Sequence, residues 1–456
     1  MTDDQEGLAS RRAALQVLRR VHEDDAWAAP VVDATLRRGN LAQRDRAFAT
    51  NLAYETLRWE GTLDWALSTV LSRPLAEVEP ALLDILRMGA WQLLYGGTPD
   101  RAAVDTAVEV TRVEVGQRAT GFVNGVLRNL ARTKGSLPWP SADSDRGLGL
   151  MTGYADWIVA AARRRFGSGV RALLEAGNRH PGPTLRAVAD ADQVRDELVR
   201  EGVDVAPGRL APEALRLAPM DAAALACVRD GRAAVQDEAS MVVARAAWGE
   251  RAAGTWQALD VAAAPGGKST HLAQLGGWVA AAEIHPGRAR MIGELAARLG
   301  VADRVAVVAA DGTRPPWRDE SFDVVLLDAP CTGLGIVRRR PDVRWRREAA
   351  DVGRLARLQG ELLDHAARMV RPGGTLLYSV CTWTVEETAD VVDAFMVLNG
   401  DLFEVDPVVL TQPSGRTNQS AVDGAPVAQR DDPGVQLTPD VHDTDGMYLC
   451  RFRRRH

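Results

Sequence analysis

Two cysteines follow short apolar runs, where a thiolate could act as a nucleophile. Cys331 comes after the apolar run 324–327 and the turn 328–330, and Cys381 comes after the run 375–377. An open α/β sheet presents its chemistry in this way, at the carboxyl ends of its strands. A thiolate can add to an aromatic ring carbon that few other side chains can attack. We therefore expect the two cysteines to end neighbouring strands, as candidate covalent catalysts.

A glycine-rich turn upstream has the same strand-then-turn pattern. The strand ends at Asp260, and the turn continues through Ala262, Ala263, Ala264, Pro265, Gly266, Gly267 and Lys268. Its glycines let the backbone approach a ligand before a helix begins. The turn is neither a GxGxxG motif nor a P-loop, so a dinucleotide or a nucleoside triphosphate is not the first interpretation.

Two further acids follow the next two expected strands. Glu283 could accept hydrogen bonds from ribose hydroxyls, and Asp311 could meet an adenine amino group. An acid at a strand end is commonly only a helix cap, so each is weak evidence alone. The ordered set with Asp260 predicts a nucleoside site, with S-adenosylmethionine as the cofactor.

The elements that must position these groups alternate between strand and helix from about residue 236. Expected strands cover 258–261, 278–283, 305–309, 322–328, 375–379, 403–405 and 447–452. Expected helices cover 268–275, 286–299 and 347–369. This alternation predicts a doubly wound, Rossmann-like parallel sheet with helices on both faces. The stretch 412–440 is rich in Pro, Gly, Ser, Asn and Gln, which indicates a loop.

The preceding part of the chain predicts two more domains. Residues 10–133 repeat apolar side chains at helical spacing, which predicts an all-helical bundle. After a linker at 135–149, residues 150–235 mix helical and strand patterns, as in a small α+β module. The predicted domains are thus a helical domain at 1–140, the α+β module at 150–235 and the catalytic domain at 236–456.

Composition narrows the class of protein. The chain has 456 residues, 46% of them apolar and 25% charged, as in a soluble globular protein. No apolar run reaches the length of a membrane span, and the acidic start lacks a signal-peptide pattern. The four cysteines form no CxxC pair, so we expect no zinc or other metal, and we expect free thiols in a reducing cytoplasm.

Charge is distributed unevenly along the chain. The net charge of −6 argues against attraction of the whole molecule to nucleic acid. A basic run nevertheless follows Cys331, and its members include Arg338, Arg339, Arg340 and Arg344. Such a run is often only a solvated face, but its place beside a candidate active-site cysteine favours contact with RNA phosphates. The chain has only two lysines, and one of them is Lys268 in the glycine-rich turn.

These motifs together resemble the Sun/Nop2 family of RNA cytosine-5 methyltransferases. The resemblance rests on the stretches 235–240, 262–268, 328–335, 338–345, 378–382 and 445–448. The helical front, which ends in the stretch 122–128, is similar to a NusB-type RNA-binding domain. The resemblance covers nearly the whole chain and implies an rRNA methyltransferase that forms 5-methylcytidine in 16S rRNA. Its partner would be 16S rRNA or a small-subunit assembly intermediate, and a monomer is the default expectation.

The resemblance also implies a role for each matching residue. Cys381 would be the nucleophile that adds to cytosine carbon 6, and Cys331 would assist breakdown of the adduct. Asp328 would hydrogen-bond the cytosine, and Lys268 would favour the thiolate. The cofactor contacts would be residues 262–268, Glu283, Asp311 and Asp328.

Three positions depart from the commonest residues of the family. Glu283 stands where many members have Asp, Ala262 where Cys is usual, and Val380 where Thr is usual. The longer acid should still reach a ribose, and the other two changes remove no chemical group that the reaction needs.

Other interpretations remain open. A tRNA cytosine-5 methyltransferase would use the same chemistry, although the NusB-like front tells against it. A noncatalytic RNA-binding assembly factor would have little reason to retain Cys331, Cys381, Asp328 and Lys268 together. A redox enzyme would need two close thiols with a resolving role.

Overall fold

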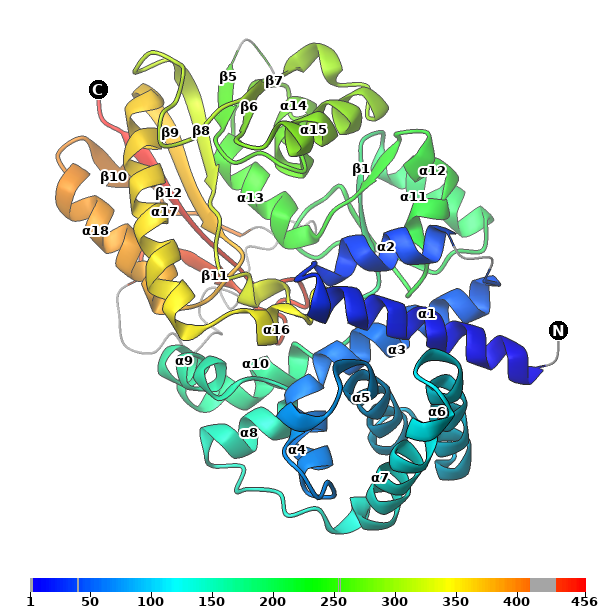
Figure 1. The fold of residues 1–456 in the computed structure, drawn as a ribbon. Helices are drawn as coiled ribbons and strands as arrows, with labels where there is room; N and C mark the ends of the chain where they lie inside the picture. The colour runs from blue at the N-terminus through cyan, green and yellow to red at the C-terminus, as the bar shows by residue number, and fades with distance from the viewer. Residues whose placement is uncertain (1–2, 39–40, 253, 255, 411–431) are drawn as a thin grey trace. The chain divides into compact units, whose positions relative to one another are not determined.

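The computed structural model describes residues 3–38, 41–252, 254, 256–410 and 432–456 (Figure 1). It forms two compact units. The helical unit comprises residues 1–160 together with 340–347, and the catalytic unit comprises residues 161–339 and 348–456. No helix in the described ranges is long and apolar enough to cross a lipid bilayer.

The helical unit buries a core of alanine, valine and leucine side chains. Its main helices are α1 (Asp3–Glu23), α2 (Ala28–Arg38), α3 (Gln43–Arg58), α4 (Glu60–Ser68), α5 (Pro80–Leu94), α6 (Asp100–Glu114), α7 (Thr120–Thr133) and α8 (Asp145–Thr152). The chain leaves the unit within α9 (Asp156–Phe166). The apolar repeat in the sequence therefore forms the helical bundle that it predicts.

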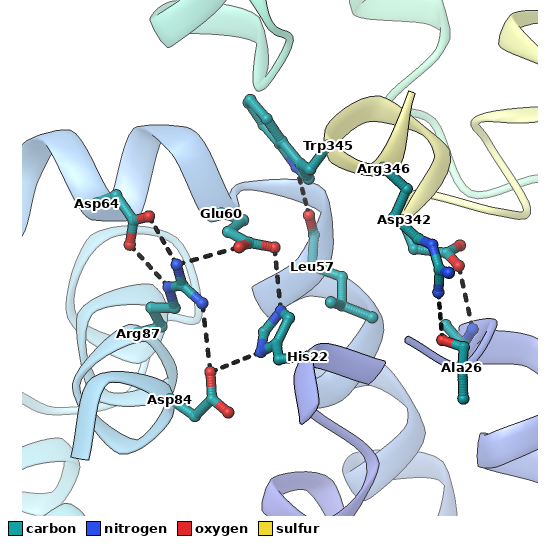
Figure 2. A network of polar contacts seen from close by, with 11 residues as sticks. His22, Ala26, Leu57, Glu60, Asp64, Asp84, Arg87, Asp342, Trp345 and Arg346 are labelled. Carbon is teal, nitrogen blue, oxygen red and sulfur yellow. Dashed lines mark hydrogen bonds and ion pairs between the residues drawn. The ribbon is translucent and has the colours of Figure 1, made fainter. Parts of the chain in front are cut away.

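A network of charged side chains joins three of these helices (Figure 2). His22 lies 2.8 Å from Asp84 and 3.3 Å from Glu60. Arg87 pairs with the same two acids and, at 2.7 Å, with Asp64. Burial alone would lower the pKa of His22, but its hydrogen bonds to Asp84 and Glu60 outweigh burial and raise that pKa to about 9. Two cations thus compensate three carboxyl groups within the helical unit.

Residues 340–347 pack into the helical unit although their neighbours in sequence belong to the catalytic unit. They contain the short helix α16 (Val343–Arg346). Its Trp345 Nε1 donates a hydrogen bond to the carbonyl oxygen of Leu57 at 2.7 Å (Figure 2). The backbone N–H of Ala28 donates to Asp342 at 3.0 Å, so Asp342 satisfies an amide at the start of α2.

The catalytic unit contains a small antiparallel sheet. Its strand order is β2 (Val205–Pro207), β3 (Ala214–Leu217), β1 (Thr184–Ala187) and β4 (Ala233–Val235). The helices α11 (Ala191–Arg200) and α12 (Ala226–Arg229) contribute to its core, which includes Leu185, Leu198 and Val228. This part matches the small α+β module expected from the sequence.

A second, larger sheet positions the candidate site (Figure 1). Its strand order is β10 (Phe403–Val405), β12 (Met447–Arg454), β9 (Val370–Val380), β8 (Phe322–Asp328), β5 (Gln257–Asp260), β6 (Trp278–Glu283) and β7 (Val305–Ala309), with β11 (Val435–Leu437) beside β12. The five strands from β9 to β7 are parallel. The order reverses between β8 and β5, which is where ligands bind in such sheets.

Alternate residues of each strand belong to opposite apolar layers. In β8, Val325 and Leu327 pack on one face with α17 (Ala349–Met369) and α18 (Ala389–Asn399). Val324 and Leu326 pack on the other face with α13 (Glu238–Trp248), α14 (Gly267–Gln274) and α15 (Pro286–Arg298). Because successive side chains of a strand point to opposite faces, both faces of the sheet are apolar and both are covered by helices.

The sheet differs from the expected one at its far edge. The strands β10, β11 and β12 run antiparallel to their neighbours, so the sheet is mixed rather than wholly parallel. The predicted loop at 412–440 lies mainly outside the described residues, but residues 435–437 within it form β11. Hydrogen bonding to β12 supplies order that the polar composition did not indicate.

Candidate active site

The two cysteines meet at the carboxyl ends of β8 and β9. The strands pair in parallel with Asp328 opposite Ser379, so the turns that follow them lie side by side. The Sγ atoms of Cys331 and Cys381 are 3.3 Å apart, and no disulfide joins them. The hydrogen bond from Cys381 and burial both raise the pKa of Cys331 well above its ordinary value. Cys331 therefore retains its proton at neutral pH.

Lys268 and Asp328 form an ion pair beside the cysteines. Lys268 Nζ lies 2.7 Å from Asp328 Oδ2, and Ser379 Oγ donates to Asp328 Oδ1 at 2.9 Å. Burial alone would lower the pKa of Lys268, but Asp328 and the charge of Cys381 outweigh burial, so that pKa is raised. The site thus places a permanent cation where a thiolate can interact with it.

Three acids lie at the ends of the adjacent strands β5, β6 and β7. Asp260 is almost fully buried, and burial raises its pKa to about 7. Glu283 is also buried and accepts a hydrogen bond from the N–H of His285 at 3.0 Å. Asp311 accepts the N–H and hydroxyl of Thr313, whose hydrogen bonds lower its pKa.

The strand-end acids fit a bound nucleoside. Asp260 Oδ2 accepts the Ser269 hydroxyl at 2.6 Å, whereas its buried Oδ1 has no hydrogen-bond partner among the described residues. Gly266 adopts φ +105°, which favours glycine, and the turn leads directly into α14. Asp260 and the turn 262–268 therefore bring a carboxyl group, the backbone of the turn and a helix start to one edge of the sheet.

Three arginines of the basic run that was predicted to bind RNA make contacts within the protein. Arg338 is buried and pairs with Asp443 at 3.1 Å, and Arg339 pairs with Asp237 and Asp445. Arg344 is fully buried, with its guanidinium 3.8 Å from the ring centroid of Tyr154 in the helical unit.

Arg338 and Arg344 are thus buried and bonded inside the protein rather than displayed on an exposed face, and their contact with RNA stays a prediction. Arg340 is exposed, and its contact with RNA stays a prediction. Arg339 is part-exposed and faces the cavity described next.

A cavity of about 680 Å³ lies in the catalytic unit, between the small sheet and the loop that follows Cys331. Its basic lining comprises Arg179, Arg209, Arg216, Arg338 and Arg339. Its acids are Asp204, Asp440 and Asp443, so five arginines face three carboxyl groups. Asp443 pairs with Arg216 and Arg338 and, at 3.9 Å, with Arg209, while the side chains of Arg179 and Arg209 are exposed. The excess of exposed arginine suits a polyanion.

Sequence reasoning missed two polar side chains of this site. Ser379 holds Asp328, and Glu387 is fully buried beneath both cysteine turns. The threonines that directly follow each cysteine, Thr332 and Thr382, were the available signal, because adjacent buried hydroxyls need polar partners.

Three family models match successive parts of the chain. The model described as "16S rRNA methyltransferase RsmB/F" matches residues 251–453, and the NusB family model matches residues 8–132. The model "Methyltr_RsmF/B-like, ferredoxin-like domain" matches residues 154–222. Their order agrees with the helical bundle, the small sheet and the large sheet described above.

Whole-length relatives agree with these matches. The chain is 38% identical to the Mycobacterium tuberculosis (strain H37Rv) protein named "Putative methyltransferase Rv1407", over 98% of this chain and 96% of that protein. It is 31% identical to "Ribosomal RNA small subunit methyltransferase B" of Salmonella arizonae, over 98% of both chains.

A solved structure, "Crystal Structure of PH0851", shares the fold with a TM-score of 0.81 over 99% of both chains at 22% identity. The structure of NSun6 from Pyrococcus horikoshii covers 65% of this chain and 97% of its own, with a TM-score of 0.55 at 21% identity. The chain therefore belongs to the 16S rRNA methyltransferase RsmB/F family, and it is an S-adenosylmethionine-dependent methyltransferase of the kind that acts on rRNA.

Proposed function

We propose that this protein forms 5-methylcytidine in 16S rRNA through a covalent adduct between Cys381 and carbon 6 of the target cytosine. The observation that carries the proposal is the pair of thiols 3.3 Å apart at adjacent strand ends, next to the Lys268–Asp328 ion pair. The names of the relatives support the rRNA substrate.

The chemistry explains why a nucleophile is needed. Carbon 5 of cytosine is too weak a nucleophile to attack a methyl donor by itself. When the Cys381 thiolate forms a bond to carbon 6, the electron pair of the ring double bond moves towards carbon 5, which can then form a bond to a methyl carbon. Loss of the carbon-5 proton to water and cleavage of the S–C6 bond restore the ring and the thiolate. S-adenosylmethionine, when bound, supplies an electrophilic methyl group.

The neighbouring side chains have distinct tasks in this proposal. Lys268 stabilises the thiolate of Cys381 before addition. Asp328, held by Lys268 and Ser379, hydrogen-bonds ring nitrogen 3 or the amino group as charge develops on the base. Cys331, which retains its proton, assists breakdown of the adduct.

The residues that would hold the cofactor are the turn 262–268 and the acids Glu283, Asp311 and Asp328, with the buried Asp260 beneath the turn. The target cytosine must leave its stack to reach Cys381. The arginine-lined cavity and the NusB-like helical unit would hold the surrounding RNA through its backbone and shape.

The decisive experiment supplies purified protein with methyl-labelled S-adenosylmethionine and unmodified 16S rRNA, followed by nucleoside mass analysis. We expect labelled 5-methylcytidine from the native chain and none from Cys381→Ala, while Cys331→Ala should accumulate a protein–RNA adduct on a denaturing gel. Methylation of tRNA but not of 16S rRNA would retain the chemistry and overturn the substrate. Cofactor binding without transfer to either RNA would favour a noncatalytic assembly factor.

A further inference from the structure

A buried carboxyl group joins the two cysteine turns from below. Glu387 ends the short helix η8 (Val385–Glu387), six positions after Cys381, and its relative exposure is 0%. Burial of a carboxyl group is costly unless hydrogen bonds compensate for it. Its partners should therefore indicate why the fold retains it.

The two oxygens of Glu387 collect donors from both cysteine turns. Oε1 accepts the backbone N–H of Thr332 at 2.8 Å. Oε2 accepts the hydroxyls of Thr332 at 2.6 Å and Thr384 at 2.8 Å. Thr332 directly follows Cys331, and Thr384 lies three residues after Cys381, so one side chain connects the backbones that carry the two sulfur atoms.

The threonines beside the cysteines also contact each other. The hydroxyl oxygens of Thr332 and Thr382 are 2.9 Å apart. Each hydroxyl has a single proton, and that of Thr332 is directed at Glu387. The Thr382 hydroxyl can donate to Thr332 Oγ1 or to Glu387 Oε2, which lies 3.4 Å away, so in either case a hydrogen bond connects the turn after Cys381 to the group that ends at Glu387.

Side chains of α17 and β9 hold Glu387 in place through hydrogen bonds. Gln359 of α17 donates its side-chain N–H groups to Glu387 Oε1 at 3.0 Å and to the carbonyl oxygen of Pro330 at 2.9 Å. Tyr378 of β9 donates its hydroxyl to the backbone carbonyl of Glu387 at 2.7 Å. Glu387 is thus held by α17 and β9 while it holds both turns, and networks of this kind are stiff when they are fully satisfied.

We propose that Glu387 is a positioning residue that sets the separation and orientation of the Cys331 and Cys381 thiols. The geometric part of this inference is independent of any reaction. Its consequence for catalysis rests on the function proposed above, because a nucleophile and a release group must both face one base. A displacement of about 1 Å can cost a hundredfold in rate.

The geometric part can be tested without RNA. Phenylarsine oxide captures two close thiols by forming two S–As bonds and releasing water, so the native chain should bind one equivalent and Cys331→Ala should bind none tightly. Glu387→Asp retains the carboxyl group but shortens its reach, and we expect clearly weaker capture. Thr382→Val removes one hydroxyl of the chain at nearly constant volume and should weaken capture in the same direction.

The matched control is Glu386→Asp. Glu386 is the adjacent residue of the same type, but its side chain pairs with exposed Arg164 at 2.9 Å. The Glu386→Asp variant should capture the arsenical and turn over substrate as the native chain does. If both Glu387→Asp and Thr382→Val melt with the native chain yet capture the arsenical with native affinity, Glu387 is only a structural residue.

The catalytic consequence is read from turnover and from the adduct. We expect Glu387→Asp to lower kcat by about tenfold to a hundredfold with little change in the KM for S-adenosylmethionine. It should also accumulate some protein–RNA adduct, because Cys331 no longer faces the Cys381 adduct. Absence of any adduct even in Cys331→Ala would refute the proposed reaction and leave the arsenical result standing. A Cys331→Ala adduct combined with native turnover in Glu387→Asp would overturn the positioning role.

Discussion

At the scale of single residues, the site depends on the compact shape of one cation. Lys268 is 13% exposed, and its Nζ lies between Asp328 at 2.7 Å and Ser240 at 3.5 Å. An arginine would keep the charge, but its guanidinium is larger, planar and set on a different stem. We expect Lys268→Arg to lower methyl transfer by about a hundredfold because the cation no longer meets the thiolate.

The measurement is single-turnover methyl transfer, with calorimetry of S-adenosylmethionine to separate loss of binding from loss of chemistry. The chain offers a matched control in its only other lysine. Lys134 pairs with Asp100 at 2.6 Å in the helical unit, and Lys134→Arg should retain full activity. Native turnover in Lys268→Arg would show that only charge matters at this position.

Most of the side chains of the candidate site can be predicted from the sequence. The sequence could place four residues together because each ends or follows a strand of a parallel sheet, and such strand ends meet at one edge. These residues are Cys331, Cys381, Asp328 and Lys268. The importance of Glu387 could not be predicted in this way, because its donors come from two turns that lie far apart in the sequence, which no local pattern contains.

At the scale of elements, the short helix α16 packs closely against α4. A Cβ atom at Gly61 would lie 2.5 Å from two ring carbons of Trp345, which no real contact tolerates. We expect Gly61→Ala to displace α16 and lower the free energy of unfolding by about 1–3 kcal/mol. Hydrogen exchange of the peptides that cover α4 and α16, with thermal unfolding, measures the effect.

Gly125 in α7 provides the control, since a Cβ there would meet nothing within 4 Å. Gly125→Ala should instead stabilise the protein by about 0.5–1 kcal/mol, because alanine is the better helix former. Trp345→Leu should recover part of the loss in Gly61→Ala. If Gly61→Ala and Gly125→Ala behave alike, Trp345 does not seat tightly against α4.

Element-level patterns also explain which parts of the fold the sequence predicts. Continuous apolar runs indicate the strands from β5 to β9, which bury both faces, and the period of 3.6 residues indicates the long helices, which bury one stripe. They cannot assign α16 to the helical unit, since four residues contain barely one turn. They also give no direction for β12, because antiparallel and parallel pairing bury the same alternate residues.

At the scale of the whole molecule, the charge of −6 conceals a local excess of arginine. Much of the basic run after Cys331 is neutralised by acids such as Asp443 and Asp445, which lie far away in sequence. That pairing explains why a linear count of arginines overstated their availability to RNA. The exposed Arg179 and Arg209 remain as cations of the cavity that can meet phosphates.

Binding of RNA should therefore depend on salt through this cavity. We expect Arg179→Gln combined with Arg209→Gln to weaken RNA binding and to reduce the slope of log affinity against log salt by roughly 0.7 for each phosphate that is no longer neutralised. Arg368→Gln is the control. Arg368 comes just before the first residue of β9 and Cys381 just after its last, so Arg368 lies at the end of the strands opposite to the candidate site. Fluorescence anisotropy of a labelled rRNA fragment at several salt concentrations measures the slope. Equal slopes for the double variant, the control and the native chain would leave the cavity without a role in RNA binding, and the helical unit would then have to supply the phosphate contacts.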